Sequence, residues 1–194
     1  AAEPPGPDQD DRGVQQRRLP FDTELRQAEM PPVPSELIRT QTRTAPAVQQ
    51  LLDLEAIRTL KHRYIRCMTQ SRWDELETLL APDIDASYSD GKYVFCDRAS
   101  LMEFLRRQDP AGDPQLSYWH VTMPEITFHG PDRASGIWAM YHFHLRKNEQ
   151  QQLEMFAYYN DEYRKADGRW QIERTGYERV MEQSLDRSSM PGLQ

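Results

Sequence analysis

Residues 53–80 constrain the fold more than any other stretch, because they predict two helices separated by a four-residue break. Side chains suited to a buried helix face recur there in steps of three and four. They are Leu54, Ile57, Leu60, Tyr64, Cys67 and Met68. The other face is predicted to carry the cationic side chains Arg58, Lys61, His62, Arg63 and Arg66. After the break at 69–72, a second helix begins at Trp73 and ends before Pro82.

The chain that follows this helical pair alternates apolar and polar residues, the pattern of half-buried strands. Asp90-Gly91 and Asp167-Gly168 are pairs typical of tight hairpin turns. Asp97 is placed to cap a third helix at 98–108. The predicted strands are 83–88, 93–95, 116–129, 134–146, 153–165 and 170–179. This order predicts an α+β domain in which a curved antiparallel sheet wraps around helices and encloses a conical pocket, a cystatin-like α+β barrel.

Residues 1–46 differ in composition from the rest and hold eight of the 14 prolines. We predict three parts: a Pro-rich arm at 1–46, a domain at 47–180 and a surface tail at 181–194. The arm lacks a core of its own, so we expect it to lie on its own domain or on a neighbouring subunit. A short helix is expected within 14–30. The expected anchors are Leu19, Phe21, Leu25, Val33, Leu37 and Ile38.

Composition excludes several classes of function. A net charge of −7 and a pI near 5.3 argue against binding to a nucleic-acid backbone. No apolar run approaches the roughly 20 residues of a membrane span. Cys67 and Cys96 do not make a disulfide framework, although a single disulfide stays open. We expect a cytoplasmic protein, with a processed, secreted form as the alternative.

Three motifs resemble those of SnoaL-like domains in the nuclear transport factor 2-like superfamily. The first is Ile57, Leu60, Arg63-Tyr64, Trp73 and Leu79-Leu80-Ala81-Pro82-Asp83. The second is the stretch YWHVTMPEITF followed by ASGIW at 134–138, and the third is YYNDEY followed by DGRWQI at 167–172. The resemblance covers residues 51–180 and implies the fold predicted above.

The same resemblance implies chemistry. Enzymes of the family include polyketide cyclases, dehydratases and ketosteroid isomerases, which need no cofactor, and its lyases typically use an Asp-His pair. The histidine position is His120, and the aspartate position is Thr69. Threonine is not a general base at neutral pH. The prediction is therefore proton transfer at His120 with Tyr64 and Thr69 holding a substrate oxygen, or else a non-catalytic ligand-binding or partner subunit.

Aromatic residues are the predicted pocket walls and suit a flat, apolar, polyketide- or steroid-like ring. They are, with one methionine, Tyr88, Tyr93, Phe95, Trp119, Trp138, Met140, Phe156 and Tyr158. His142 and His144 share a strand face, but two ligands without a nearby carboxylate are a weak metal signal, so no metal is predicted. The long strands have two apolar faces, and a homodimer or homotrimer is expected to cover the second.

Overall fold

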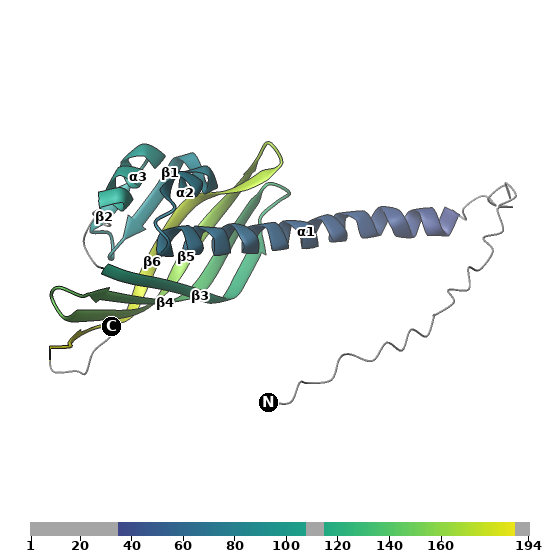
Figure 1. Ribbon diagram of the computed structural model, residues 1–194. Coiled ribbons are helices and arrows are strands. Elements are labelled where there is room, and N and C mark those ends of the chain that lie inside the picture. The colour runs from purple at the N-terminus through teal and green to yellow at the C-terminus, as the bar shows by residue number, and fades with distance from the viewer. Residues whose placement is uncertain (1–34, 108–114, 189–194) are drawn as a thin grey trace, which may run out of the picture.

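The computed structural model describes residues 35–107 and 115–188, with residues 35–45 and 115 described by their backbone alone. Figure 1 shows the helices lying on one face of a strongly curved sheet. The elements are α1 (Ser35–Thr69), α2 (Trp73–Leu79), β1 (Leu80–Tyr88), β2 (Tyr93–Phe95), α3 (Arg98–Arg107), β3 (Gln115–Phe128), β4 (Arg133–Arg146), β5 (Gln151–Ala166) and β6 (Arg169–Asp186). The predicted α+β class is confirmed, and so is the break between the first two helices.

The sheet has six strands in the order β2-β1-β6-β5-β4-β3. Every pair is antiparallel except β1 with β6, which is parallel, so the sheet is mixed and remains open between β2 and β3. A Cβ added at Gly176 would lie 2.6 Å from the Ser87 carbonyl oxygen. Glycine therefore permits the close approach of β6 to β1.

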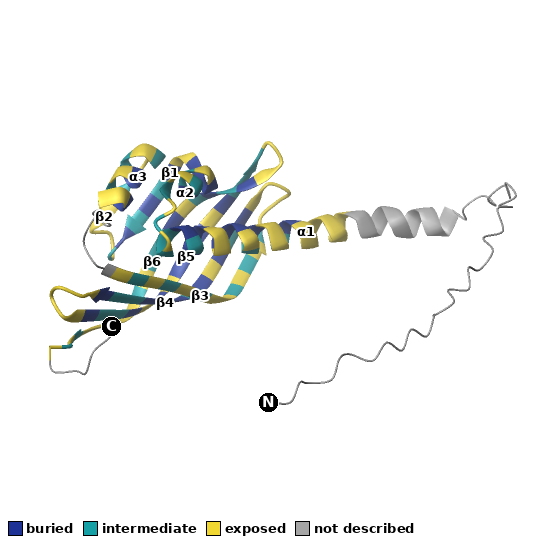
Figure 2. Cartoon of the chain, in the orientation of Figure 1, coloured by how far each residue is buried: buried dark blue, intermediate teal, exposed yellow. Residues whose placement is uncertain are grey.

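The core lies between α1 and the inner face of the sheet, where the buried positions gather in Figure 2. From α1, Ile57 and Tyr64 are fully buried, and from β4 and β5, Trp138 and Tyr163 are fully buried. Asp53 fixes the middle of the long helix, because its carboxylate accepts hydrogen bonds from Lys165 at 2.6 Å and from Trp170 Nε1 at 2.9 Å. These contacts hold α1 against the β5–β6 hairpin.

Two segments extend further than the sequence predicted. Helix α1 begins at Ser35 and continues through Pro46, so it crosses the predicted boundary of the arm. A proline inside a helix removes one hydrogen bond without forbidding the helix. Strand β6 runs to Asp186 by pairing with β5 beyond a bulge, where residues 181–186 were predicted as tail. The expected helix at 14–30 and four of the expected anchors lie outside the described residues, and Leu37 and Ile38 lie where only the backbone is described.

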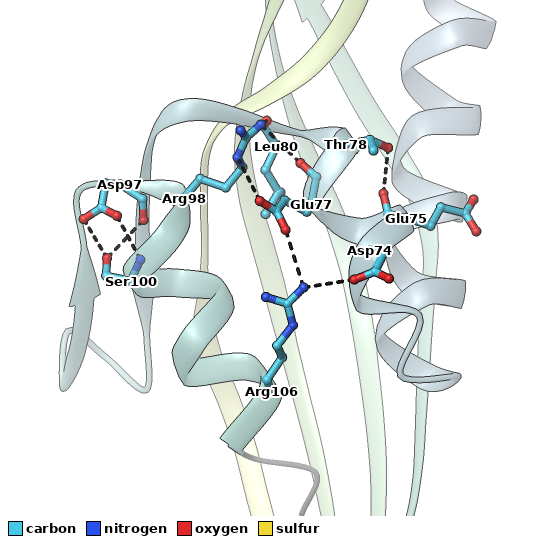
Figure 3. A network of polar contacts seen from close by, with 9 residues as sticks. All are labelled: Asp74, Glu75, Glu77, Thr78, Leu80, Asp97, Arg98, Ser100 and Arg106. Atoms are coloured by element: carbon cyan, nitrogen blue, oxygen red, sulfur yellow. Dashed lines mark hydrogen bonds and ion pairs between the residues drawn. The ribbon is translucent and has the colours of Figure 1, made fainter.

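Helix α3 is tied to α2 and to the residue that follows it by arginine side chains (Figure 3). Arg98 donates to the Leu80 carbonyl oxygen at 3.2 Å, and Arg106 pairs with Asp74 at 3.1 Å. The predicted cap is present, since Asp97 Oδ1 accepts a hydrogen bond from the backbone N–H of Ser100 at 2.8 Å. The arginine contacts thus hold α3 against α2.

Both cysteines are free thiols, with Cys67 buried among the core side chains and Cys96 exposed. Burial raises the pKa of the Cys67 thiol, and the Glu75 carboxylate raises it further. Within residues 35–107 and 115–188, no helix has the length and hydrophobicity that crossing a bilayer requires.

Candidate active site

A pocket of about 320 Å³ lies at the seam between α1 and the edge strand β3. Its volume is at the lower end of the roughly 300–1,000 Å³ typical of small-molecule sites. Two of the three predicted catalytic residues, Thr69 and His120, lie in its wall. The lining residues are His62, Ile65, Arg66, Thr69, Gln70, Tyr118, Trp119, His120 and Val121.

The helix supplies its side of the pocket through the ordinary period of an α-helix. His62, Ile65, Arg66 and Thr69 recur in steps of three and four, so they share one stripe that faces β3. The backbone N–H of Trp119 donates a hydrogen bond to Thr69 Oγ1 at 3.3 Å. Thr69 therefore joins the end of the helix to the strand at the position where the family resemblance expects an aspartate.

Neighbouring residues of β3 point to opposite sides of the sheet, as the pleat requires. Trp119 lies opposite His142 of β4 in register, and the two rings stack with their centroids 3.6 Å apart and their planes 9° from parallel. Trp119 packs against the core, whereas His120 is exposed and lies opposite Tyr141. Both residues are among those that line the pocket, although their side chains point to opposite faces of the strand.

His142 is buried and lies against other side chains on several sides. Its Nε2 lies 2.8 Å from the Ser117 hydroxyl, and its side chain is buried behind Trp119. Burial, reinforced by the nearby His144, lowers the pKa of His142 to about 3. The imidazole is therefore neutral at physiological pH and holds the Trp119 ring in place. Among the described residues, no group of three or more His, Cys, Asp or Glu side chains is arranged to hold a metal ion.

Tyr64, the third predicted catalytic residue, lies in the core and does not line the pocket. Its hydroxyl is 3.1 Å from that of Tyr88, and the Tyr64 and Tyr159 rings meet edge to face at 6.3 Å. Burial raises the pKa values of all three phenols well above the ordinary tyrosine value. These side chains therefore stay protonated and fill the cone that the sheet forms.

A buried ion pair between Lys61 and Asp161 lies beside these tyrosines and corrects the prediction that Lys61 belongs to the polar face of the helix. Its Nζ and Oδ2 atoms are 2.7 Å apart, and both side chains are fully buried. Among the described residues Lys61 Nζ has no hydrogen-bond partner, so the contact is an ion pair. Nζ also lies 3.5 Å from the centre of the Tyr159 ring.

Asp161 is further fixed by hydroxyl groups of its own sheet. Tyr163 donates to one carboxylate oxygen at 2.7 Å, and Thr175 donates to the other at 2.8 Å. Trp138 Nε1 in turn donates to the Tyr163 hydroxyl at 2.8 Å. The aspartate thus acts as the shared acceptor of a buried network that links α1, β4, β5 and β6.

The remaining predicted wall residues are spread over the fold. Tyr93 and Phe95 pack on Phe104 of α3, with ring centroids about 5 Å apart. Phe156 and Tyr158 are exposed on the outer face of β5, away from the helices. Trp138 and Met140 are core residues, as is Tyr88. Trp119 is therefore the one predicted wall residue among those that line the pocket.

Sequence reasoning missed the roles of three residues. His142 supports the Trp119 ring, Arg66 lines the pocket, and Lys61 pairs with Asp161 in the core. His142 faces the core because it shares a strand face with Trp138 and Met140, a pattern already visible in the sequence. Lys61 continues the series Ile57, Lys61, Tyr64, whose spacing of four and three points to the core. The role of Arg66 had no local signal, because the opposite wall comes from a strand about 50 residues away.

A family model for the SnoaL-like domain matches residues 49–176, more than half of the chain. The chain belongs to the SnoaL-like domain family. This membership agrees with the nuclear transport factor 2-like fold, and the match spans α1 from Gln49 through most of β6.

Solved structures similar to this SnoaL-like protein share its fold at low sequence identity. A putative scytalone dehydratase from Novosphingobium aromaticivorans has a TM-score of 0.65 and 19% identity, covering 72% of this chain and 91% of that one. A hexachlorocyclohexane dehydrochlorinase from Novosphingobium barchaimii has a TM-score of 0.64 and 14% identity, covering 76% and 99%. An NTF2-like protein with a cystatin-like fold from N. aromaticivorans has a TM-score of 0.60 and 18% identity, covering 72% and 89%.

Proposed function

We propose that this SnoaL-like protein is a cofactor-independent lyase, isomerase or cyclase that acts on a small, hydrophobic, ring-containing molecule in the α1–β3 pocket. The observation that carries the proposal is that His120 and Thr69 line one pocket of about 320 Å³. The names of two similar structures support it, since a dehydratase and a dehydrochlorinase both carry out eliminations.

In the proposed reaction His120 takes a proton from a carbon next to a substrate carbonyl. An imidazole accepts and returns protons near neutral pH, which suits this step. The Thr69 hydroxyl accepts a hydrogen bond from Trp119 and retains its own proton, which it can donate to the substrate oxygen. Departure of a leaving group with its electron pair then gives a lyase, whereas return of the proton to another carbon gives an isomerase.

A second candidate is a ligand-binding subunit without catalysis. The observation that favours it is the character of the lining, since none of the described lining residues carries a carboxylate that could orient His120. In this case the pocket binds a ring-containing molecule and releases it unchanged.

The test is a thermal-shift screen with small aromatic and polyketide-like molecules, followed by turnover assays on every hit. A ligand at 100 times its dissociation constant is expected to add roughly 2.7 kcal/mol of stability. For a substrate found in this way, His120→Gln is expected to lower kcat/KM by about 10²- to 10⁴-fold, because the proton acceptor is lost.

The matched control for the turnover assay is His129→Gln, which removes an exposed histidine just beyond β3 that does not line the pocket. It should leave kcat/KM within about threefold of the wild type, since it touches neither the pocket nor the core. Equal activity of His120→Gln and the wild type would exclude His120 as the base. Binding of hits without turnover of any would favour the ligand-binding subunit.

We also propose that the outer face of the sheet is covered by further copies of this chain. Ile137, Phe156 and Tyr158 are each between 39% and 47% exposed on the side opposite the helices. An exposed apolar patch of this kind marks an interface in many proteins. Light scattering at micromolar concentration is expected to give the mass of a dimer or trimer, and Tyr158→Glu should shift that mass toward the monomer. A monomeric wild type would contradict the proposal.

A further inference from the structure

We infer that the α1–β3 pocket selects ring-containing molecules that carry a carboxylate, and that Arg66 is the residue that recognises the anion. This inference rests on the proposed function only in assigning the same pocket. It adds a charge requirement to that function.

The lining is cationic and aromatic without an opposing acid. His62, Arg66 and His120 bring basic groups to the pocket, and none of the described lining residues is Asp or Glu. A guanidinium has five N–H donors in a planar fork that matches the two oxygens of a carboxylate. Arg66 is therefore the lining group best suited to an organic anion.

Glu75 is the acid nearest to Arg66, and its charge is shared. Its carboxylate contacts Arg66 at 2.6 Å, Arg63 at 3.2 Å and Arg72 at 3.3 Å. The hydrogen bond from Arg66 is the main cause of a lowered Glu75 pKa, so this carboxylate is ionised at neutral pH. One negative charge among three guanidinium groups leaves this group with an excess of two positive charges.

The other acids of α2 do not cancel this excess at Arg66. Asp74 and Glu77 instead pair with Arg106 of α3, at 3.1 Å and 3.4 Å (Figure 3). The C-terminal end of α1 contributes a partial negative charge of about half a unit. That is smaller than the excess of two, so the end of the pocket beside Arg66 remains positive.

The rest of the wall suits a flat ring. Trp119 supplies aromatic surface, and its stacking on His142 at 3.6 Å restricts how its indole can turn. Ile65 and Val121 add apolar surface from the two opposite sides of the seam. A molecule with one or two fused rings and one carboxylate fits both the apolar wall and the charge.

The experiment compares two probes of nearly equal shape, 2-naphthoate and the neutral 2-naphthamide, by isothermal titration calorimetry. The wild type is expected to bind the carboxylate roughly 10- to 100-fold more tightly, the range for a hydrogen bond to a charged group. Arg66→Gln should remove most of this preference and leave the affinity for the amide unchanged within about threefold.

Arg63→Gln is the matched control, because Arg63 lies on the same helix and contacts the same Glu75 but does not line the pocket. The two arginine side chains are 47% and 40% exposed, so neither change disturbs the core. Arg63→Gln should keep the preference within about threefold. Any one of three results would overturn the inference. The wild type could bind the two probes with equal affinity, the two variants could lose the carboxylate preference equally, or neither probe could bind at millimolar concentration.

The outcomes separate this inference from the proposed function. If the protein binds the carboxylate through Arg66 but turns over no ligand, the proposed catalysis is contradicted and the inference is supported. If turnover depends on His120 but shows no preference for a carboxylate, the proposed function is supported and the inference is contradicted.

Discussion

Lys61→Met is expected to destabilise the fold by about 3–5 kcal/mol, the usual cost of leaving one member of a buried ion pair without its partner. Asp161 would keep its hydroxyl donors, Tyr163 and Thr175, but would lose the positive charge of its Lys61 partner. Burial lowers the pKa of Lys61, and the attraction of Asp161 opposes that effect. The measurement is urea unfolding, read as a fall in the midpoint at an unchanged m value.

Two further variants make this test specific. Lys92→Met removes an exposed lysine in the turn after β1 and should change stability by no more than about 0.5 kcal/mol. The double variant Lys61→Met with Asp161→Asn should lose less unfolding free energy than the sum of the losses in the two single variants. The reason is that neither partner is then left as an unpaired buried charge. A loss below about 1 kcal/mol for Lys61→Met would mean that the ion pair is exposed to water.

The wild type is also expected to lose stability between pH 6.5 and 4.5 through His142. In the fold the pKa of His142 is about 3, lowered from 6.5 by burial and then by His144. An unfolded chain therefore binds a proton in this range that the folded chain does not, so stability falls as pH falls. At pH 4.5 the expected loss from this group is about 2–3 kcal/mol, and it is absent above pH 6.5.

The comparison for this pH effect is His142→Phe, which keeps a ring against Trp119 but cannot take up a proton. Between pH 6.5 and 4.5 this variant should lose about 2–3 kcal/mol less stability than the wild type. The measurement is chemical unfolding at each pH. His129→Phe replaces an exposed histidine and should track the wild-type curve. Parallel curves for the wild type and His142→Phe would show that His142 is protonated as easily in the fold as in the unfolded chain.

Local patterns were enough to predict most of the secondary structure. The three- and four-residue steps of residues 54–68 placed the buried face of α1, and the Asp-Gly pair at 167–168 placed the β5–β6 turn. Asp167 and Gly168 both have positive φ, at 51° and 74°, as a tight hairpin turn requires. Such signals depend on a few neighbouring residues, so they can be read from a sequence alone.

Placing the site depended on pairings between distant segments. Whether Trp119 or His120 faces the core depends on the register of β3 against β4, since a shift of one residue exchanges the two faces. The wall that His120 and Thr69 share exists because the edge strand lies against α1.

What the sequence alone determined is the α+β class, the family resemblance and the order of the elements. What only the tertiary structure decided is the burial of Lys61, the neutral state of His142, the parallel pairing of β1 with β6 and the position of the pocket. Lys61 shows the physical reason, because a lysine on a helix is expected to face water until its partner is known. That partner, Asp161, comes from a strand 100 residues later, and the free energy of burying both charges depends on their meeting.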